Sequence, residues 1–219
     1  DTTFAPFEFQ NDAGEYVGID MELLAAIAED QNFQYDLQYL GFDAAVQALE
    51  SGQADGVIAG MSITEDRKKT FDFSDPYFDS GVVMGIAEGN NDIKSYADLQ
   101  GKKVAVKRGT EGYTFAESIK DEYGFETVVF DSSDAMCMDV VVGNSVACFE
   151  DYPVLGYGIT QGNGLKIVTD KEQGSSYGFA VGKGQNAELL EKFNTGLANL
   201  KESGKYQEIL DTYIPRNNP

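Results

Sequence analysis

The residues best able to do chemistry surround an arginine in the segment Ser62-Ile-Thr-Glu-Asp-Arg. Thr64 predicts the start of a short helix, and Arg67 projects from its first turn. A helix N-terminus offers backbone N–H donors and a guanidinium adds a planar two-donor fork, so together they suit a carboxylate. The alternative is a surface arginine that pairs with Asp66 or Glu65, as most surface arginines do.

Three other side chains could recognise the rest of a small polar ligand. Asp151 follows a predicted strand and could accept an ammonium group with help from the Ser62 hydroxyl, although capping the next helix is the ordinary alternative. Phe4 and Phe42 lie in turns beside polar residues. They could sandwich an apolar ligand stem, although core packing is the default for aromatic side chains.

Opposite charges stand at the ends of two different predicted strands, at Asp1 and Lys107. Lys107 follows Val104-Ala-Val, which favours a buried stem with its ammonium at the strand end, and a solvated surface lysine is the alternative. Ligands of open α/β sheets bind beyond the carboxyl ends of the strands. The residues that follow each predicted strand are therefore candidates: Gly60, Met61 and Ser62, then Lys107 to Glu111 including Thr110, then Glu150 and Asp151.

The residues available for catalysis are few. The sequence has no histidine, which removes Ser-His-Asp and Cys-His nucleophiles, the usual zinc ligand and the commonest general base. Gly109-Thr-Glu-Gly is too short for a phosphate-binding loop, and no metal-ligand spacing is evident. Glu150 and Asp151 are adjacent, which says little about facing carboxylates. The sequence therefore offers little support for an enzyme, and we expect neither a cofactor nor a metal.

The charge of the chain excludes one class of partner. With 37 acidic and 16 basic residues the formal net charge is −21 over 219 residues, which opposes binding to nucleic acid. No apolar run approaches the ~20 residues that span a bilayer, so we expect a soluble domain. The two cysteines, Cys137 and Cys148, are predicted to be partly buried thiols, and a bridge between them is the alternative.

Helix and strand signals alternate along the chain, which predicts an α/β fold with mostly parallel sheets. The first helix is predicted from Asp20, as its N-cap, to Gln31, and a second from Asp43 to Gly52. A buried strand is predicted at Ala54–Ala59. Further helices are predicted at Thr64–Lys69, Thr110–Glu122, Ser132–Val142, Tyr152–Gln161, Ala187–Glu202 and Lys205–Thr212, and further strands at Lys102–Val106, Phe125–Phe130, Ser145–Phe149 and Tyr177–Val181.

The chain is predicted to form two similar lobes. The order helix, glycine, buried strand in Phe42–Ala59 recurs in Ser133–Asp151, although any αβ unit has this order. Asp79–Val82 and Gly174–Tyr177 are short, rich in small residues and flanked by strands, which predicts a two-strand hinge. Lobe 1 would comprise residues 1–82 plus 176–219, and lobe 2 residues 83–175, each an open sheet flanked by helices.

Six segments together resemble the substrate-binding proteins of polar amino-acid ABC transporters, the family-3 solute-binding proteins. They span essentially the whole chain: Asp1-Thr-Thr-Phe-Ala-Pro-Phe-Glu-Phe, Gly18-Ile-Asp-Met-Glu-Leu-Leu, Gly41-Phe-Asp, Ala54-Asp-Gly-Val-Ile-Ala-Gly-Met-Ser-Ile-Thr-Glu-Asp-Arg, Phe71-Asp-Phe-Ser-Asp-Pro-Tyr and Tyr177-Gly-Phe-Ala-Val. The resemblance implies a type II periplasmic-binding-protein clamp. It also implies that closure on a free amino acid creates the docking surface for an ABC permease.

The same resemblance assigns roles at the α-amino acid end of a ligand. Arg67 would hold the α-carboxylate, aided by the backbone N–H groups of Ser62 and Thr110. Asp151 would hold the α-ammonium together with the carbonyl of Gly60 and the Ser62 hydroxyl.

At the other end of the ligand, the resemblance implies that Phe4 and Phe42 stack on the side-chain stem while Asp1 and Lys107 read the distal group. An aspartate and a lysine at these positions resemble the glutamine binders. A carboxamide offers an NH₂ that Asp1 can accept and an oxygen to which Lys107 can donate.

Two departures from the family pattern bear on the ligand. Family members often carry a small residue in place of Glu111, and Glu150 adds a carboxylate beside Asp151, so either could favour arginine, histidine or lysine. The chain also starts at the motif aspartate, and we expect an upstream strand in the longer protein.

Two rival functions use the same clamp. One is the ligand-binding domain of a membrane sensor or receptor. The other is a dehydratase, for which Glu111 or Glu150 would be the only candidate acid. The transport interpretation implies a monomeric extracytoplasmic domain, periplasmic or tethered at the cell surface by a lipid anchor or by fusion to the permease.

Overall fold

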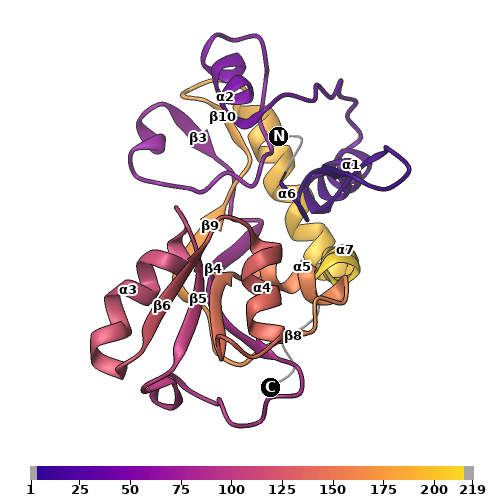
Figure 1. Cartoon of the computed structure of the whole chain (residues 1–219). Helices are drawn as coiled ribbons and strands as arrows, with labels where there is room; N and C mark the ends of the chain where they lie inside the picture. The colour runs from indigo at the N-terminus through magenta and orange to yellow at the C-terminus, as the bar shows by residue number, and fades with distance from the viewer. Residues whose placement is uncertain (1–3, 215–219) are drawn as a thin grey trace. The chain divides into compact units, whose positions relative to one another are not determined.

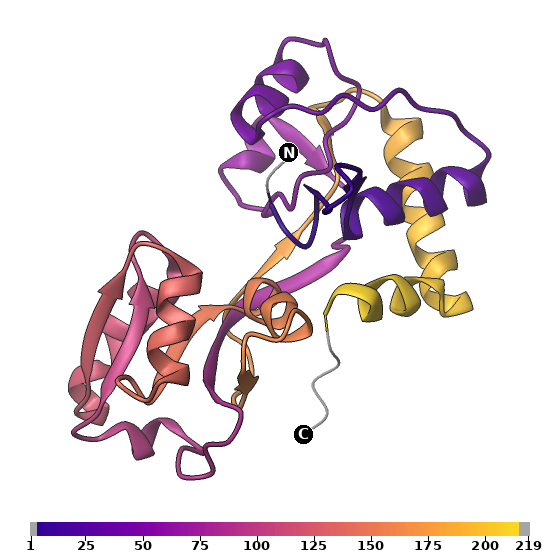
Figure 2. The same cartoon turned by 45° about the vertical axis from the view of Figure 1, so that its right-hand side comes forward.

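The computed structural model describes residues 4–214 and divides them into two compact units (Figures 1 and 2). Unit 1 comprises the described residues up to Asp79 together with Ser175–Tyr213, and unit 2 comprises Ser80–Gly174 and Ile214. The chain leaves unit 1 within β4 (Phe78–Ala87) and returns within β9 (Glu172–Tyr177), and these two strands pair with each other. In the prediction from the sequence, the chain passed from lobe 1 to lobe 2 after residue 82 and back to lobe 1 after residue 175.

Unit 2 contains a mixed sheet whose strands follow the order β6-β5-β7-β4-β8. Strand β9 also pairs with β4. β5 pairs in parallel with β6 and β7, whereas β4 runs antiparallel to β7 and β8. The elements that first appear here are β5 (Lys103–Lys107), β6 (Glu126–Phe130), β7 (Ala147–Asp151), β8 (Leu165–Ile167), η2 (Tyr96–Leu99), α3 (Glu111–Tyr123), α4 (Ser133–Val141) and α5 (Tyr152–Thr160).

The α/β class is confirmed, and the prediction of a mostly parallel sheet is refined to a mixed one. Strands β5, β6 and β7 are joined through α3 and α4, and such helical crossovers make neighbouring strands parallel. β4 instead enters the sheet as a crossing strand from unit 1, so it meets β7 in the opposite direction.

Two apolar cores cover the two faces of this sheet. Because side chains alternate along a strand, Met84 and Phe149 pack with Phe115 of α3 on one face. Val83 and Cys148 pack with Met136 of α4 on the other face, so α3 and α4 lie on opposite sides of the sheet (Figure 1).

Unit 1 has less regular pairing. Its elements are β1 (Phe9–Gln10), β2 (Tyr16–Val17), α1 (Ile19–Gln31), α2 (Phe42–Glu50), η1 (Arg67–Lys69), β3 (Phe71–Phe73), β10 (Ala180–Gly182), α6 (Ala187–Ser203) and α7 (Lys205–Tyr213). β1 pairs with β2 and β3 with β10, both antiparallel. α1 packs on α6 so closely that a Cβ at Gly196 would lie 2.8 Å from Ile27 Cγ2.

The prediction that Asp20 caps the first helix is wrong. The N-cap is Gly18, with no side-chain hydrogen bond, and Asp20 lies in the first turn of α1 with no exposed surface. A helix brings Asp20 onto the same face as Leu23, Leu24 and Ile27, three, four and seven residues later. This is the buried face of α1, so the carboxyl group points into the unit.

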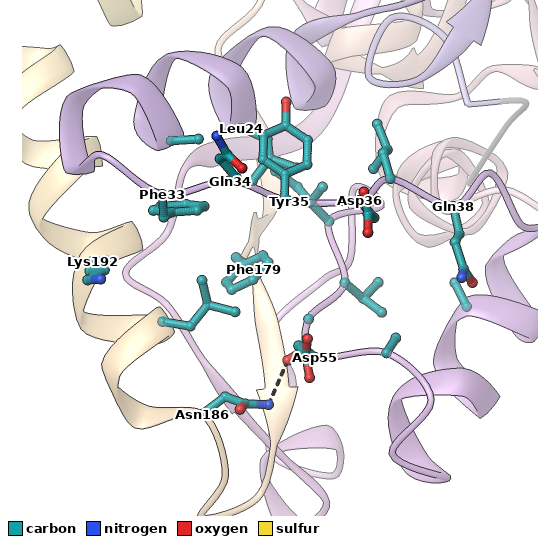
Figure 3. Close-up of a pocket in the computed structure, with 18 of the residues that line it drawn as sticks. Leu24, Phe33, Gln34, Tyr35, Asp36, Gln38, Asp55, Phe179, Asn186 and Lys192 are labelled. Carbon is teal, nitrogen blue, oxygen red and sulfur yellow. Dashed lines mark hydrogen bonds between the residues drawn. The ribbon is translucent and has the colours of Figure 1, made fainter.

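The predicted strand Ala54–Ala59 is reduced to one bridge, Val57 with Ala180. Val57 both donates to and accepts from Ala180, at 2.9 and 3.0 Å. The segment Gln34–Leu40 alternates like a strand, yet its backbone makes no hydrogen bond within the described residues. Residues of both segments line a cavity of about 1350 Å³ (Figure 3).

Cys137 of α4 and Cys148 of β7 are free, buried thiols that hydrogen-bond to each other. This contact lowers the pKa of Cys137 and raises the pKa of Cys148 well above its usual value, with burial adding to the rise for Cys148.

Over residues 4–214, no helix has both the length and the hydropathy that crossing a bilayer requires.

Candidate functional site

In unit 1 the guanidinium of Arg67 has no carboxylate partner among the described residues. Its Nη1 donates to the Ser62 carbonyl at 2.8 Å, and its Cζ lies 5.4 Å from the centre of the Phe42 ring. The alternative of a surface ion pair is wrong, because the neighbouring carboxylates pair with lysines instead: Glu65 with Lys68 at 2.9 Å and Asp66 with Lys69 at 3.4 Å. Arg67 keeps guanidinium donors for a further acceptor.

The helix predicted at Thr64–Lys69 is only the single 3₁₀ turn η1. The N-cap of this turn is Asp66 and not Thr64 as predicted, although Thr64 Oγ1 accepts from the Arg67 N–H at 3.1 Å. A turn this short has little dipole, so the guanidinium rather than the helix end supplies the positive charge here.

Gly60 lies directly under the ring of Phe4. Its φ of +55° is left-handed, and a Cβ at this position would lie 2.4 Å from Phe4 Cε1. Only glycine fits both conditions without strain. The Gly60 N–H is used, donating to Asp20 Oδ2 at 2.9 Å and to the Tyr77 hydroxyl at 3.1 Å.

The remaining predicted residues of unit 1 are buried or half-buried. Met61 is 1% exposed and its side chain belongs to the core beside Phe71 and Ala180, so only its backbone borders the predicted site. Phe42 is half-buried and packs against the same core. Ser62 is half-buried in a bridge with Tyr177, and its N–H meets no acceptor within residues 4–214.

In unit 2 Lys107 belongs to a hydrogen-bonded triad at the ends of β5 and β7. The register of these strands pairs residues 43 apart, such as Val104 with Ala147, and the same offset brings Lys107 beside Glu150. Lys107 Nζ lies 3.4 Å from Glu150 Oε2 and donates to Ser133 Oγ at 2.7 Å. Ser133 in turn donates to Glu150 at 2.8 Å. The solvated-surface alternative for Lys107 is wrong.

Thr110 is the N-cap of α3, which was predicted to begin at this residue and begins at Glu111. Its Oγ1 accepts from the Tyr113 N–H at 3.2 Å and donates to the Lys107 carbonyl at 2.7 Å, while its own N–H has no acceptor in the described chain. Glu111 is exposed in the first turn of the helix. At Gly112 a Cβ would lie 2.6 Å from the Phe149 carbonyl oxygen, so α3 begins in close contact with β7.

Asp151 ends β7 and is the N-cap residue of α5, but its side chain makes no capping hydrogen bond. Burial, the neighbouring Glu150 and, more weakly, Glu111 raise the pKa of Asp151 to about 6, against the opposing effect of Lys107. A carboxylate held in this way is poised to gain from a cation. Unit 2 therefore offers an unsatisfied negative charge, where unit 1 offers an unsatisfied positive one.

Asp1 lies outside the described residues. The other ten predicted residues fall into two groups, one on each unit: Phe4, Phe42, Gly60, Met61, Ser62 and Arg67 on unit 1, and Lys107, Thr110, Glu111 and Asp151 on unit 2. Within residues 4–214 no cluster of three or more candidate side chains could hold a metal ion.

Sequence reasoning missed the groups that hold these residues in place. Glu8, Asp20 and Tyr77 are buried around the Gly60 peptide, and Ser133 links Lys107 to Glu150. Only Asp20 left a signal, since a carboxylate on the apolar face of a helix must find partners.

The cavity of Figure 3 is a separate feature of unit 1. Phe33, Tyr35, Asp55 and Phe179 are among its lining residues, and it includes none of the ten described residues that were predicted to bind a ligand. Asn186 spans part of it by donating to the Asp55 carbonyl at 3.1 Å. We assign the functional site to the two polar groups and not to this cavity.

Comparison with known proteins agrees on one family. Residues 1–216 match the bacterial extracellular solute-binding proteins, family 3. The second substrate-binding domain of a protein described as an amino acid ABC transporter of Streptococcus pneumoniae is 48% identical, with a TM-score of 0.94 over 98% of this chain and 97% of that one. Substrate-binding domain 2 of GlnP from Lactococcus lactis, in an open conformation, is 41% identical, with a TM-score of 0.92 over 100% and 94%. The arginine-binding periplasmic protein of Mannheimia haemolytica is 33% identical over 97% of this chain and 88% of its own length.

Proposed function

Because the chain belongs to the family-3 bacterial extracellular solute-binding proteins, we propose that it captures free glutamine and delivers it to an ABC permease by clamp closure. Membership of the family makes it an amino-acid-binding component of an ABC importer with the type II periplasmic-binding-protein fold. The relatives are binding proteins and not enzymes. We also propose that it acts as a monomer outside the cytoplasm, in the periplasm or tethered at the cell surface.

The observation that carries the proposal is a pair of uncompensated charges of opposite sign. Arg67 has no carboxylate partner in the described chain, and the Asp151 side chain accepts no capping hydrogen bond. A free amino acid carries a carboxylate and an ammonium group, so it can satisfy both. In the proposed complex, one ligand engages Arg67 of unit 1 and Asp151 of unit 2.

Unused backbone donors support the same arrangement. The N–H groups of Ser62 and Thr110 have no acceptor within the described residues. Both residues are half-buried, and charge-assisted bonds from their N–H groups to a carboxylate would be strong. We assign both to the α-carboxylate, beside Arg67, and the Gly60 carbonyl to the ammonium beside Asp151.

The assignment of glutamine rests on Lys107. An ammonium has three donors, and two of them point to Ser133 and Glu150, which leaves one N–H for an acceptor on the ligand. The carboxamide oxygen of glutamine is such an acceptor. A guanidinium has only donors, so arginine would leave that N–H facing a like charge.

Arginine is the second candidate, and a specific contact favours it. Glu150, which is 1% exposed, pairs with Lys107 and offsets its charge, which weakens the repulsion against a cationic ligand. The arginine-binding relative at 33% identity adds to this alternative. In both cases the chain binds a free polar amino acid.

A thermal-shift panel of the twenty amino acids tests the proposal, since a ligand that binds the folded state raises Tm. We expect glutamine to give the largest shift and asparagine, which is one methylene shorter, a smaller one. Titration calorimetry then compares Lys107→Met with Lys103→Met, a matched loss of charge at the exposed start of the same strand. We expect Lys107→Met to weaken glutamine by about 1.5–3 kcal/mol, since a charged donor is lost, and to improve arginine.

The control Lys103→Met should bind both ligands as the wild type does. A wild-type protein that binds arginine more tightly than glutamine would exclude the glutamine assignment. No shift with any amino acid would exclude the proposed function altogether.

A further inference from the structure

The N–H of Gly60 is held by two buried side chains. Its N–H donates to both Asp20 Oδ2 and the Tyr77 hydroxyl, and neither Asp20 nor Tyr77 has any exposed surface. The ring of Phe4 covers the glycine from the other side. The Gly60 N–H belongs to the Ala59–Gly60 peptide, so groups that a ligand would never touch fix this peptide and the position from which the Gly60 carbonyl extends.

A second buried carboxyl group lies behind Asp20. Glu8 is 1% exposed, and its side chain is in hydrogen-bond contact with that of Asp20. Glu8 Oε1, Glu8 Oε2 and Asp20 Oδ1 meet no donor among the described residues. Two ionised carboxylates are acceptors only and cannot hydrogen-bond to each other, so the pair must hold a proton.

The surrounding donors decide which carboxyl group carries this proton. Burial raises the pKa of Asp20, but Asp20 accepts from the Gly60 N–H and from the Tyr77 hydroxyl, and these bonds oppose the rise by favouring its charged form. Glu8 receives no such bonds within residues 4–214. Burial and the charge of Asp20 raise the pKa of Glu8 to about 11, so Glu8 is the neutral partner.

The backbone of Glu8 contributes as well. Its N–H donates to the Phe4 carbonyl at 2.9 Å and its carbonyl accepts from the Phe4 N–H at 2.8 Å. Glu8 thus holds Phe4 through its backbone and Asp20 through its side chain, and both of these residues contact Gly60.

We propose that Glu8 is a positioning residue for ligand binding: it stays protonated and donates to Asp20, which fixes the Ala59–Gly60 peptide and so the position of Gly60. The inference rests on the proposed function only where it concerns ligand affinity. The buried proton itself is a property of the unliganded protein and is tested without ligand.

The first measurement is the thermal unfolding of ligand-free protein from pH 5 to pH 9, followed by circular dichroism, for wild type, E8Q and E22Q. A glutamine at position 8 keeps an N–H donor for Asp20 but has no proton to lose. Since the folded-state pKa of Glu8 is raised, the stability tied to its proton is full below about pH 4.5 and is lost progressively as the pH rises. The unfolding equilibrium constant of the wild type should rise up to about tenfold per pH unit relative to that of E8Q.

E22Q is the matched control, because Glu22 is exposed on the same helix as Asp20 and its loss should leave the pH profile parallel to that of the wild type. Parallel profiles for E8Q and wild type would show that Glu8 is ionised and would overturn the proposal.

The second measurement is glutamine affinity at pH 7. We expect E8Q to bind within about threefold of the wild type and E8A to bind at least about tenfold more weakly, which amounts to about 1.4 kcal/mol or more. Wild-type affinity in E8A would exclude a positioning role. If the wild type binds no amino acid, the proposed function fails, while the pH profiles still decide whether Glu8 holds the proton.

Discussion

Units 1 and 2 hold their polar residues by different means. In unit 2, Lys107, Thr110 and Asp151 stand at the ends of regular strands or at the start of a helix, and strand register alone brings Lys107 beside Glu150. In unit 1, Arg67 extends from a single 3₁₀ turn, and Gly60 lies in irregular chain that buried carboxyl groups support. Regular pairing positions one group, and a buried polar network positions the other.

The two groups also differ in charge. The unit 1 group keeps an unpaired guanidinium, whereas the unit 2 group keeps a carboxylate whose pKa is raised to about 6 by burial and by neighbouring carboxylates. Because Lys107 of unit 2 is already paired with Glu150, neither group alone offers unpaired charges of both signs. The comparison therefore predicts that removal of either charge weakens every amino-acid ligand, and by unequal amounts.

The largest effect is expected for Arg67→Ala. The alanine removes the guanidinium that we assign to the α-carboxylate and leaves that carboxylate without its cation. We expect the binding free energy of glutamine to weaken by about 2–5 kcal/mol in titration calorimetry, with a similar loss for any other amino acid that binds.

Lys68→Ala is the control for this variant. Lys68 is the next residue, and its ammonium is already paired with Glu65 on the surface, so its removal should change affinity by less than about 0.5 kcal/mol. Equal affinities of Arg67→Ala and wild type would show that Arg67 is an ordinary surface residue and does not bind the ligand.

The comparison also explains which residues the sequence could predict. Thr110 and Ser132 cap α3 and α4 as their types and spacing indicate, each accepting from the N–H three residues on. The lysine and the aspartate at strand ends follow from the same local patterns. Such features depend on a few neighbouring residues, and those are visible in the sequence.

The parts that could not be predicted depend on distant residues. Glu8, Asp20 and Tyr77 come from three separate segments and meet near Gly60, which lies in a fourth, and no local pattern records that meeting. Likewise, Ala54–Ala59 has the composition of a strand, but a strand needs a neighbour that pairs along its length, and within the described residues this segment forms one bridge, between Val57 and Ala180. Propensity alone cannot supply the missing neighbour.

A smaller effect is expected for Asp151→Asn. The amide keeps an oxygen acceptor for the ligand ammonium but loses the charge, so glutamine should bind about 1–3 kcal/mol more weakly at pH 8. Wild-type affinity should also fall as the pH drops below about 6, because Asp151 becomes protonated, while the variant should show no such decline.

The stability of the unliganded protein should change in the opposite direction. Since the folded-state pKa of Asp151 is raised, its contribution is full below about pH 4 and is lost as the pH rises through about 6. Asp151→Asn should therefore be more stable than wild type at pH 8, on the order of 1–3 kcal/mol, and no more stable at pH 4. A variant that is weaker both in binding and in stability at pH 8 would mean that Asp151 has a structural partner.

The smallest effect is expected for Glu111→Gln, and it separates the two candidate ligands. Glu111 is exposed at the start of α3, where its charge interacts with the helix dipole and weakly raises the pKa of Asp151. Exposed charges are screened over about 8 Å at physiological salt, so glutamine affinity should change by less than about 0.5 kcal/mol. The pH below which glutamine affinity declines should move slightly downward, because one source of the raised Asp151 pKa is gone. Arginine, if it binds, should also lose little. A tenfold loss for arginine with none for glutamine would instead place Glu111 against the distal group of a cationic ligand, and the selectivity would then come from the acidic residues of unit 2 rather than from Lys107.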